Sequence, residues 1–226
     1  MQTTSITFPA NGGTTPGFLA IPDGPGPFPG VVAIQEWWGL VPHIKDVAGR
    51  FAQAGFVALA PDLYHGQVAD EPDEARKLAM ELDRERAVVE IRAAARYLQT
   101  RPDVAPARIG VVGWCMGGSL SIASAAAGDE FGAAVAFYGM PRDPGIAAGM
   151  KAPLLGLYGA EDHGITPEAV QALEAALTAG GVTHEIHVYP GAGHAFFNDA
   201  RPHIFQPEPA ADAWQRTLAW FRRFLV

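Results

Sequence analysis

The chain has 226 residues, 49% of them hydrophobic, with a formal net charge of −8 and a single cysteine. Such a chain can bury a large core without disulfides, and its lone thiol is typical of a reducing compartment. The negative charge argues against a nucleic-acid surface, and no apolar run reaches the roughly 20 residues of a membrane-spanning helix. Residues 1–7 lack the basic and then apolar pattern of a signal peptide, so we expect a cytoplasmic protein.

The first half of the chain alternates strands with helices after an initial pair of strands. Its segments are, in order, strands at 5–8, 18–21 and 30–34, a helix at about 43–54, a strand at 56–60 and a charged helix at 73–100 that breaks near Leu82. The strands at 30–34 and 56–60 are apolar throughout, which is typical of strands buried on both faces of a sheet.

The second half continues the alternation. Its segments are a strand at 109–112, a helix at 119–127, strands at 133–137 and 154–158, a helix at 167–179, a strand at 183–189 and an amphipathic helix at 209–225. This order predicts an α/β fold, with a mostly parallel sheet covered by helices on both faces. No repeat or clear boundary divides the chain, so we expect one domain over residues 1–226, with its site at the carboxyl ends of the strands.

The turn around Cys115 has the pattern of a nucleophile elbow, in which a buried strand turns sharply into a helix. The turn is so tight that the positions two before and two after the nucleophile favour glycine, and Gly113 and Gly117 occupy them. The free N–H groups at the start of the helix favour a thiolate and stabilise an oxyanion. The alternative for a lone cysteine is a buried thiol that acts as a small apolar side chain.

Nucleophilic catalysis also requires a base near the thiol and a group that orients the base. The chain order of α/β hydrolases is nucleophile, acid and histidine, and Cys115, Asp162 and His194 follow that order. His194 lies in a glycine-rich turn after the last strand, with His203 as the alternative base. For the acid, Glu161 competes with Asp162.

Several segments, taken together and in order, resemble the dienelactone hydrolase (carboxymethylenebutenolidase) family. They are Gln-Glu-Trp-Trp-Gly at 35–39, Ala-Pro-Asp-Leu-Tyr at 60–64, Gly-Trp-Cys-Met-Gly-Gly at 113–118, Gly-Ala-Glu-Asp at 159–162 and Gly-Ala-Gly-His-Ala-Phe at 191–196. The resemblance implies an α/β-hydrolase fold, with a mostly parallel central sheet and helices on both faces. It also implies hydrolysis of a small ester or lactone, with no cofactor and no metal.

The resemblance further implies a nucleophile that is switched on by its substrate. It places the catalytic triad on Cys115, Asp162 and His194, and the family's glutamate on Glu36. The resting thiol is then neutral and paired with the glutamate. An anionic lactone moves the glutamate, which takes the thiol proton, and the thiolate pairs with the histidine and attacks the lactone carbonyl.

The family's oxyanion hole falls on the backbone N–H groups of Trp37 and Met116. The neighbouring Trp37 and Trp38 predict an apolar wall around Glu36, which would raise the pKa of its carboxyl group and suit a proton acceptor. From the residues alone, Glu36 is equally compatible with a hydrogen-bonded buried acid or a salt-bridge partner.

Substrate-binding residues follow less directly from the pattern. In the family an arginine four positions after the catalytic histidine holds the substrate carboxylate, but this chain has Asn198 there, with Arg201 three positions further on. An asparagine does not replace a bidentate arginine without loss of anion affinity. The family's second arginine lies after the Pro-Asp-Leu-Tyr loop, where Arg76 and Arg84 are candidates. The aromatic candidates for the pocket wall are Trp37, Tyr64, Tyr138 and Phe196, and core or rim packing is the alternative for each of them.

These observations leave more than one function open. We expect a cysteine-dependent hydrolase of a small ester or lactone, acting through an acyl-enzyme. A general short-chain carboxylesterase without an anion requirement is the first alternative, and a non-catalytic or redox-sensing protein is the second. The expected partner is a small-molecule substrate, without nucleic acid, membrane or metal, and the expected assembly is a monomer or weak homodimer.

Overall fold

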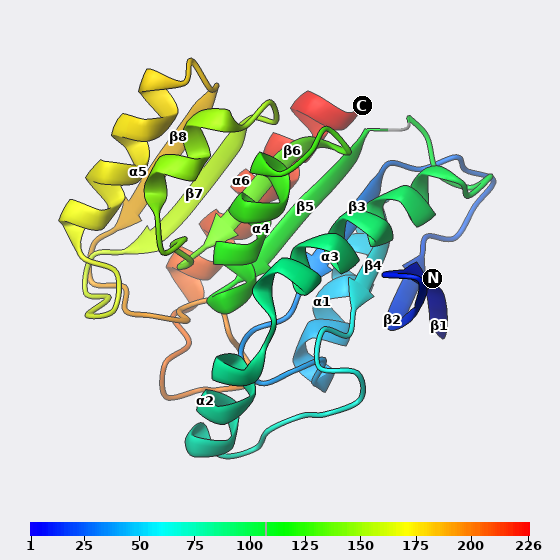
Figure 1. The fold of residues 1–226 in the computed structure, drawn as a ribbon, viewed down its shortest axis with the longest axis horizontal. Coiled ribbons are helices and arrows are strands. Elements are labelled where there is room, and N and C mark those ends of the chain that lie inside the picture. The colour runs from blue at the N-terminus through cyan, green and yellow to red at the C-terminus, as the bar shows by residue number, and fades with distance from the viewer. Residues whose placement is uncertain (107) are drawn as a thin grey trace.

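The computed structural model describes residues 1–106 and 108–226, and Figure 1 shows a twisted sheet with helices on both faces. The sheet has eight strands in the order β1-β2-β4-β3-β5-β6-β7-β8. The antiparallel pairs β1–β2 and β2–β4 form one side, and the remaining strands pair in parallel. The mostly parallel α/β architecture expected from the sequence is therefore confirmed.

The strands match the apolar segments of the sequence, with the first two longer than expected. Their bounds are β1 (Gln2–Ala10), β2 (Gly13–Ile21), β3 (Gly30–Ile34), β4 (Val57–Pro61), β5 (Ile109–Trp114), β6 (Phe131–Phe137), β7 (Leu154–Gly159) and β8 (His184–Tyr189). β3, β4, β5 and β7 are buried along their whole length, as strands covered on both faces should be.

The helices also lie where the periodicity predicts them. Their bounds are α1 (Pro42–Gln53), α2 (Pro72–Glu81), α3 (Arg84–Gln99), α4 (Met116–Ala126), α5 (Pro167–Ala179) and α6 (Pro207–Leu225), with a short 3₁₀ helix, η1 (Pro144–Gly149). The expected break near Leu82 separates α2 from α3, and Asp83 caps α3 by accepting a hydrogen bond from the Arg86 N–H at 3.0 Å. No pattern in the sequence predicted η1.

Two apolar layers hold the helices on the sheet. One layer lies between the sheet and α3, α4 and α5, and the other lies between the sheet and α1 and α6. The second layer is rich in aromatic rings, and the Phe51 ring centroid lies 4.6 Å from that of Trp214. In the described residues, no helix combines the length and apolar character that crossing a membrane requires.

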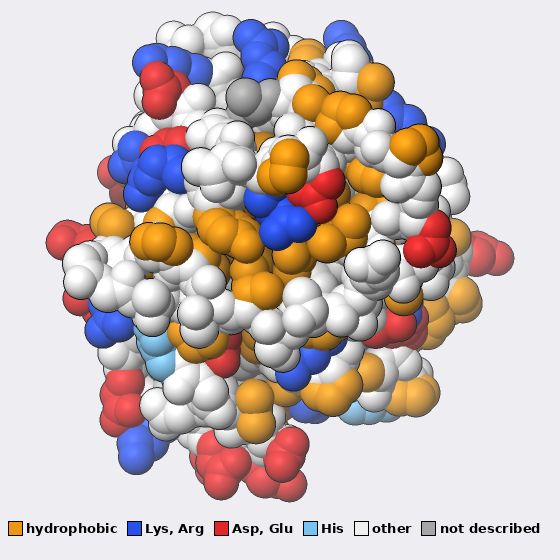
Figure 2. Space-filling model, turned by 90° about the vertical axis from the view of Figure 1, so that its right-hand side faces the viewer, with side chains coloured by type: hydrophobic (Ala, Val, Ile, Leu, Met, Phe, Trp, Pro, Cys, Tyr) orange, Lys and Arg blue, Asp and Glu red, His pale blue; other side chains and the backbone are white. Residues whose placement is uncertain are grey.

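One face of the surface is shown in Figure 2, where hydrophobic side chains gather near the centre. Basic and acidic side chains are interspersed around them on that face. Charge of one sign therefore does not dominate this side of the molecule.

The turn between β5 and α4 is the most constrained part of the fold. Cys115 has a left-handed backbone conformation, with φ of 54° and ψ of −116°, and its N–H donates to the Phe137 carbonyl oxygen at 3.0 Å. A β-carbon on Gly113 would overlap the carbonyl group of Gly117. A β-carbon on Gly117 would lie 2.5 Å from the Ile34 carbonyl oxygen. These contacts explain why glycine occupies both positions beside the nucleophile.

Gly113→Ala tests this constraint. The added methyl group meets backbone atoms that cannot move independently, so we expect the free energy of unfolding to fall by about 3 kcal/mol or more. Gly149→Ala is the matched control, because nothing lies within 4 Å of its β-carbon position, and we expect a change below about 1 kcal/mol. Urea unfolding followed by circular dichroism measures both, and equal stability of the two variants would contradict the prediction.

Candidate active site

The predicted site residues meet at one edge of the sheet. Glu36 follows β3, Cys115 follows β5, Asp162 follows β7 and His194 follows β8. These strands belong to the parallel part of the sheet, β3-β5-β6-β7-β8, so their carboxyl ends lie along one edge. The topology thus brings together side chains that lie far apart in the sequence.

Asp162 and His194 form a close acid–base pair. The Nδ1 atom of His194 lies 2.6 Å from the Oδ2 atom of Asp162. The Oδ1 atom of Asp162 accepts hydrogen bonds from the N–H groups of Gly164 at 2.8 Å and Ile165 at 3.2 Å. These bonds fix the carboxylate, and the carboxylate fixes the imidazole. The competing acid, Glu161, is exposed, and the alternative base, His203, is also exposed.

The other side of the imidazole faces the nucleophile. The imidazole of His194 interacts electrostatically with the Cys115 side chain. Since Asp162 occupies Nδ1, the Nε2 atom is the one left for the thiol. Burial lowers the pKa of His194, but the interactions with Asp162 and Cys115 outweigh it and raise the pKa to about 10. The ring is therefore suited to carry the proton of a thiolate–imidazolium pair.

Glu36 lies buried beside this pair, with 1% of its surface exposed. Its Oε2 atom accepts a hydrogen bond from Nδ2 of Asn198 at 2.6 Å, and its Oε1 atom accepts one from the Tyr138 hydroxyl at 3.4 Å. Burial raises the pKa of Glu36 to about 6, although the Asn198 hydrogen bond and the charge of His194 partly offset the rise. The predicted rise in pKa thus has burial as its main cause.

The arrangement of Glu36 differs from the expected resting state. Within the described residues, its side-chain hydrogen bonds go to Asn198 and Tyr138, and none joins it to Cys115. The Asn198 amide is itself held, because its Oδ1 atom accepts a hydrogen bond from the Ala200 N–H at 3.2 Å. The fixed amide therefore holds the Glu36 carboxylate in a hydrogen bond that differs from the bond to the resting thiol implied by the resemblance.

Two backbone N–H groups lie where an oxyanion hole is expected. Met116 is the first residue of α4, and Trp37 lies in the turn after β3. Among residues 1–106 and 108–226, neither N–H group donates to a protein acceptor. Both are therefore free to donate to a developing oxyanion, and the Met116 group adds the positive end of the α4 dipole.

Two of the four aromatic candidates, Phe196 and Tyr138, are buried residues that support the site. Phe196 is fully buried, and its ring centroid lies 5.3 Å from those of Tyr138 and Tyr189, so it belongs to the core and not to a pocket wall. Tyr138 is also fully buried and lies between Glu36 and the His194 ring, whose centroid is 5.1 Å from its own. Asn198 is 2% exposed and binds Glu36. Tyr138 and Asn198 therefore both hold the Glu36 carboxylate.

The three arginine candidates have different surroundings. Arg76 has a side chain that is 64% exposed and pairs with Asp73 at 3.1 Å, so it is a surface group of α2. Arg201 stacks on Trp38, with its guanidinium carbon 3.5 Å from the ring centroid, and its charge slightly lowers the pKa of Glu36. Arg84, at the start of α3, is the candidate that lies near the thiol.

Arg84 has an unusual electrostatic setting. Burial lowers the pKa of its guanidinium, the charge of Arg142 lowers it further, and Tyr64 and Cys115 raise it. Neither Arg84 nor Arg142 forms an ion pair with a carboxylate in the described part of the chain. The sequence reasoning missed Arg142. Its place shortly after β6, at the same sheet edge, was the signal that could have found it.

The sequence profile of the dienelactone hydrolase family matches residues 15–225. The chain belongs to the dienelactone hydrolase family. As a member of this family it is a carboxylic-ester hydrolase with the α/β-hydrolase fold, as the resemblance implied.

Individual relatives match this dienelactone hydrolase family member along almost its whole length. Protein usf of Aquifex pyrophilus is 36% identical over 231 residues, covering 98% of this chain and 98% of its own. A Methylorubrum extorquens protein provisionally named carboxymethylenebutenolidase is 36% identical over 236 residues, covering 98% of this chain and 81% of its own. A crystal structure of a provisionally named dienelactone hydrolase from Klebsiella pneumoniae has 34% identity and a TM-score of 0.90, covering 99% of each chain.

Two cavities flank the site of this dienelactone hydrolase family member. A cavity of about 430 Å³ is bounded by α2, α3 and the loop after β4, and Tyr64 lies in its wall. A cavity of about 460 Å³ on the other side includes Trp38, Asn198 and Arg201 in its wall. In residues 1–106 and 108–226, no cluster of three or more His, Cys, Asp or Glu side chains could hold a metal ion.

Glu36→Gln tests the effect of burial on this carboxyl group. The folded chain has a pKa of about 6 there against an ordinary value of 4.5, so it binds more protons than the unfolded chain between those values, and stability falls as pH rises through them. The ionised side chain costs about 2 kcal/mol at pH 7.5. Because a glutamine can still pair with Asn198 and Tyr138, we expect the variant to be more stable at pH 7.5 by up to that amount.

Urea unfolding at pH 7.5 and pH 4 measures this gain, which should disappear at the lower pH. Glu161→Gln is the matched control, because Glu161 is exposed next to the same site. A gain that is the same at both pH values, or that also occurs in the control, would contradict a buried ionised Glu36.

Proposed function

We propose that the chain hydrolyses a small ester or lactone bearing a carboxylate, through a Cys115–His194–Asp162 triad and an acyl-enzyme. The observation that carries the proposal is the position of His194, which Asp162 holds at 2.6 Å and which interacts electrostatically with Cys115. The proposal treats residues 1–226 as one catalytic domain that acts on a small molecule as a monomer or weak homodimer.

The first half of the reaction forms the acyl-enzyme. The Cys115 thiolate attacks the substrate carbonyl carbon, and the oxygen becomes an oxyanion that accepts hydrogen bonds from the N–H groups of Trp37 and Met116. Each such donor is worth about 2.7–4 kcal/mol in the transition state. The carbon–oxygen bond of the ester then breaks, and the leaving oxygen takes the proton carried by His194. In a lactone, the leaving oxygen stays attached to the acyl group.

The second half restores the enzyme. Neutral His194 accepts a proton from a water molecule, whose oxygen attacks the thioester carbonyl carbon. The same N–H groups bind the second oxyanion. The carbon–sulfur bond then breaks, and the Cys115 sulfur leaves as a thiolate paired with protonated His194. Asp162 keeps the imidazole in one orientation throughout.

Glu36 supplies the acceptor that removes the thiol proton from a neutral Cys115. A carboxyl group with a pKa near 6 is ionised at neutral pH, yet it is basic enough to accept a proton when the charge around it changes. Its partners Asn198 and Tyr138 are neutral donors, so no ion pair holds it in the charged form.

Arg84 and Arg142 support the proposal that the substrate bears a carboxylate. Both are cations without a carboxylate partner among the described residues, and Arg84 interacts electrostatically with Cys115. They supply positive charge that Asn198 cannot supply at the position of the family's arginine. The relative from Methylorubrum extorquens is named for a lactone that carries a carboxymethylene group, which agrees with this substrate class.

Cys115→Ala tests the proposed nucleophile. Removal of the sulfur prevents the acyl-enzyme from forming, so kcat for activated esters and lactones should fall by at least about 10³-fold. His194→Ala should have a similar effect, and His203→Ala, which removes the exposed alternative base, should retain activity. Turnover that survives in Cys115→Ala would overturn the proposed mechanism. Reversible peroxide modification of Cys115 without turnover of any ester would support the redox alternative instead.

Arg84→Gln tests the proposed substrate class. Loss of a charged hydrogen bond to the substrate carboxylate should raise KM for an anionic ester by about 10-fold to 100-fold. KM for a neutral p-nitrophenyl ester of the same length should change by less than about twofold, because the thiol and the oxyanion hole are intact.

Arg76→Gln is the matched control for this experiment, since Arg76 is a surface arginine of the preceding helix. Arg84→Gln combined with Arg142→Gln should raise KM for the anionic ester further. Equal use of neutral and anionic esters by the wild type, with no effect of Arg84→Gln on either, would identify a general carboxylesterase.

A further inference from the structure

The loop after β4 reaches the two residues of the proposed oxyanion hole. The Tyr64 hydroxyl lies 3.2 Å from the Trp37 carbonyl oxygen and 3.4 Å from the Met116 sulfur. Burial raises the pKa of Tyr64, so this hydroxyl keeps its proton. A phenol has one proton to donate, and the carbonyl oxygen is the stronger acceptor of the two. Tyr64 therefore fixes the turn that carries the Trp37 N–H while it packs against Met116.

Tyr64 is buried and packs in the core, but part of it borders a cavity. The ring forms part of the wall of the 430 Å³ cavity, which also includes Leu63, Leu78 and Leu82. A side chain next to a cavity lacks partner atoms on that side, so it can shift at little cost unless its backbone is fixed. The position of Tyr64 depends on how its loop is anchored.

The loop is anchored first by its own polar groups. The Asp62 carboxylate accepts hydrogen bonds from the N–H groups of Tyr64 at 3.2 Å and Gly66 at 2.7 Å. The Gln35 side-chain oxygen accepts one from the Leu63 N–H at 3.1 Å. The next residue, His65, has a left-handed backbone with φ of 51°, a conformation that costs energy for a residue other than glycine.

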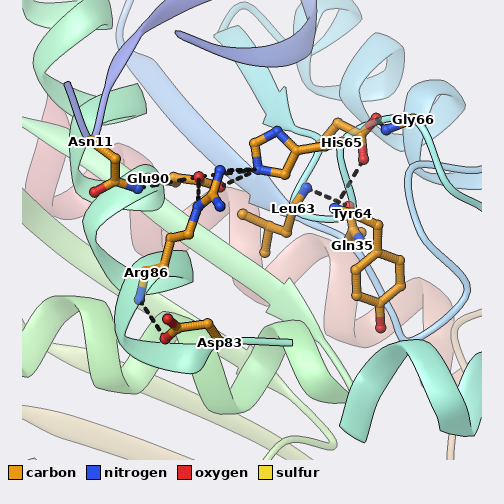
Figure 3. Close-up of polar contacts among 10 residues, drawn as sticks. Asn11, Gln35, Leu63, Tyr64, His65, Gly66, Asp83, Arg86 and Glu90 are labelled. Carbon is orange, nitrogen blue, oxygen red and sulfur yellow. Dashed lines mark hydrogen bonds and ion pairs between the residues drawn. The ribbon is translucent and has the colours of Figure 1, made fainter. Parts of the chain in front are cut away.

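Glu90 provides the second anchor, from α3. Its side chain is 2% exposed, and its carboxylate oxygens lie 3.1 and 3.2 Å from Nε2 of His65. The same carboxylate accepts hydrogen bonds from Nε of Arg86 at 2.9 Å and from Nδ2 of Asn11 at 3.2 Å. Figure 3 shows these three side chains converging on Glu90, with Tyr64 on the far side of His65. One buried carboxylate thus joins the β1–β2 turn, α3 and the loop after β4.

Burying a carboxylate carries a desolvation cost that its ion pairs only partly return. The apolar side chains of α3 already attach this helix to the sheet, so the polar cluster serves a different purpose. Its effect on the structure is to hold His65, and the backbone of His65 is directly joined to that of Tyr64.

We propose that Glu90 and His65 are positioning residues that act through Tyr64 to hold the N–H groups of Trp37 and Met116 at the spacing an oxyanion requires. This inference rests on the function proposed above. Hydrogen bonds to an oxyanion form fully only in the transition state, so a loss of spacing lowers kcat and leaves KM nearly unchanged.

The central experiment compares Tyr64→Phe, Glu90→Gln and the double variant with the wild type, on one ester substrate. Removal of an oxyanion donor costs about 10²-fold to 10³-fold in kcat. A displaced donor should cost less, so we expect kcat to fall about 10-fold in Tyr64→Phe, with KM within about twofold. In Glu90→Gln, kcat should fall by a similar factor, again with little change in KM. The double variant should be no slower than Tyr64→Phe alone, because both changes act through one group.

Glu130→Gln is the matched control for Glu90→Gln. Glu130 accepts hydrogen bonds from Arg92 and Arg96 of the same helix α3, and its side chain is 9% exposed. It has no contact with the loop after β4 among its described hydrogen bonds. We expect Glu130→Gln to lower Tm about as much as Glu90→Gln while leaving kcat within about twofold.

Three results would overturn the inference: unchanged kcat in Tyr64→Phe, additive effects in the double variant, or an equal loss of kcat in Glu130→Gln. If Glu90→Gln does not fold, Tyr64→Phe and His65→Ala carry the comparison. Cys115→Ala in the same assay separates the two proposals. Activity without Cys115 refutes the proposed function, whereas a requirement for Cys115 with a silent Tyr64→Phe refutes only the positioning role.

Discussion

Crowding of backbone atoms around Cys115 is the constraint on which the rest of the site depends. The turn fits only because glycines let α4 approach its neighbours, and β-carbons on Gly117 and Gly118 would lie 2.5 Å from the Ile34 and 2.7 Å from the Phe137 carbonyl oxygens. Those carbonyl groups end β3 and β6. The strained turn is therefore wedged between the strands that lead into the Glu36 and Tyr138 segments. The nucleophile and its supporting residues are consequently fixed by one packing arrangement rather than by independent loops.

The surroundings of Asp162 and Glu36 shift the pKa values of their carboxyl groups in opposite directions. Burial raises the pKa of Asp162, but the hydrogen bonds from His194 and from backbone N–H groups outweigh it and lower the pKa. Glu36 is more deeply buried and, among the described residues, receives hydrogen bonds only from neutral side chains, and its pKa rises to about 6. Asp162 thus stays ionised and orients the base, whereas Glu36 has a pKa close to neutral pH, so it can exchange a proton. The same side-chain chemistry yields two roles because the depth of burial and the number and charge of the donors differ.

The sequence predicted elements and the chain order of the site well, since both are read from local pattern. Apolar runs and helical spacing located the strands and helices, and glycine spacing located the turn at Cys115. The direction of a side chain after a strand has no such local signal, so Phe196 was expected in a pocket and lies in the core. Contacts between segments that are distant in the sequence also leave no local sequence pattern. Glu90 meets Asn11 across 79 positions, and only the folded chain shows that pairing.

The placement of β8 has a consequence for how the protein loses function. β8 is an edge strand that pairs only with β7 and is partly exposed along its length, whereas β5 lies in the buried middle of the sheet. Edge elements open locally at lower free energy than central ones. His194 follows β8 and Cys115 follows β5, so local opening at the edge removes the base while the nucleophile turn stays folded. We therefore expect inactivation by heat to begin as a reversible separation of imidazole from thiol, which oxidation of the unpaired sulfur would make permanent.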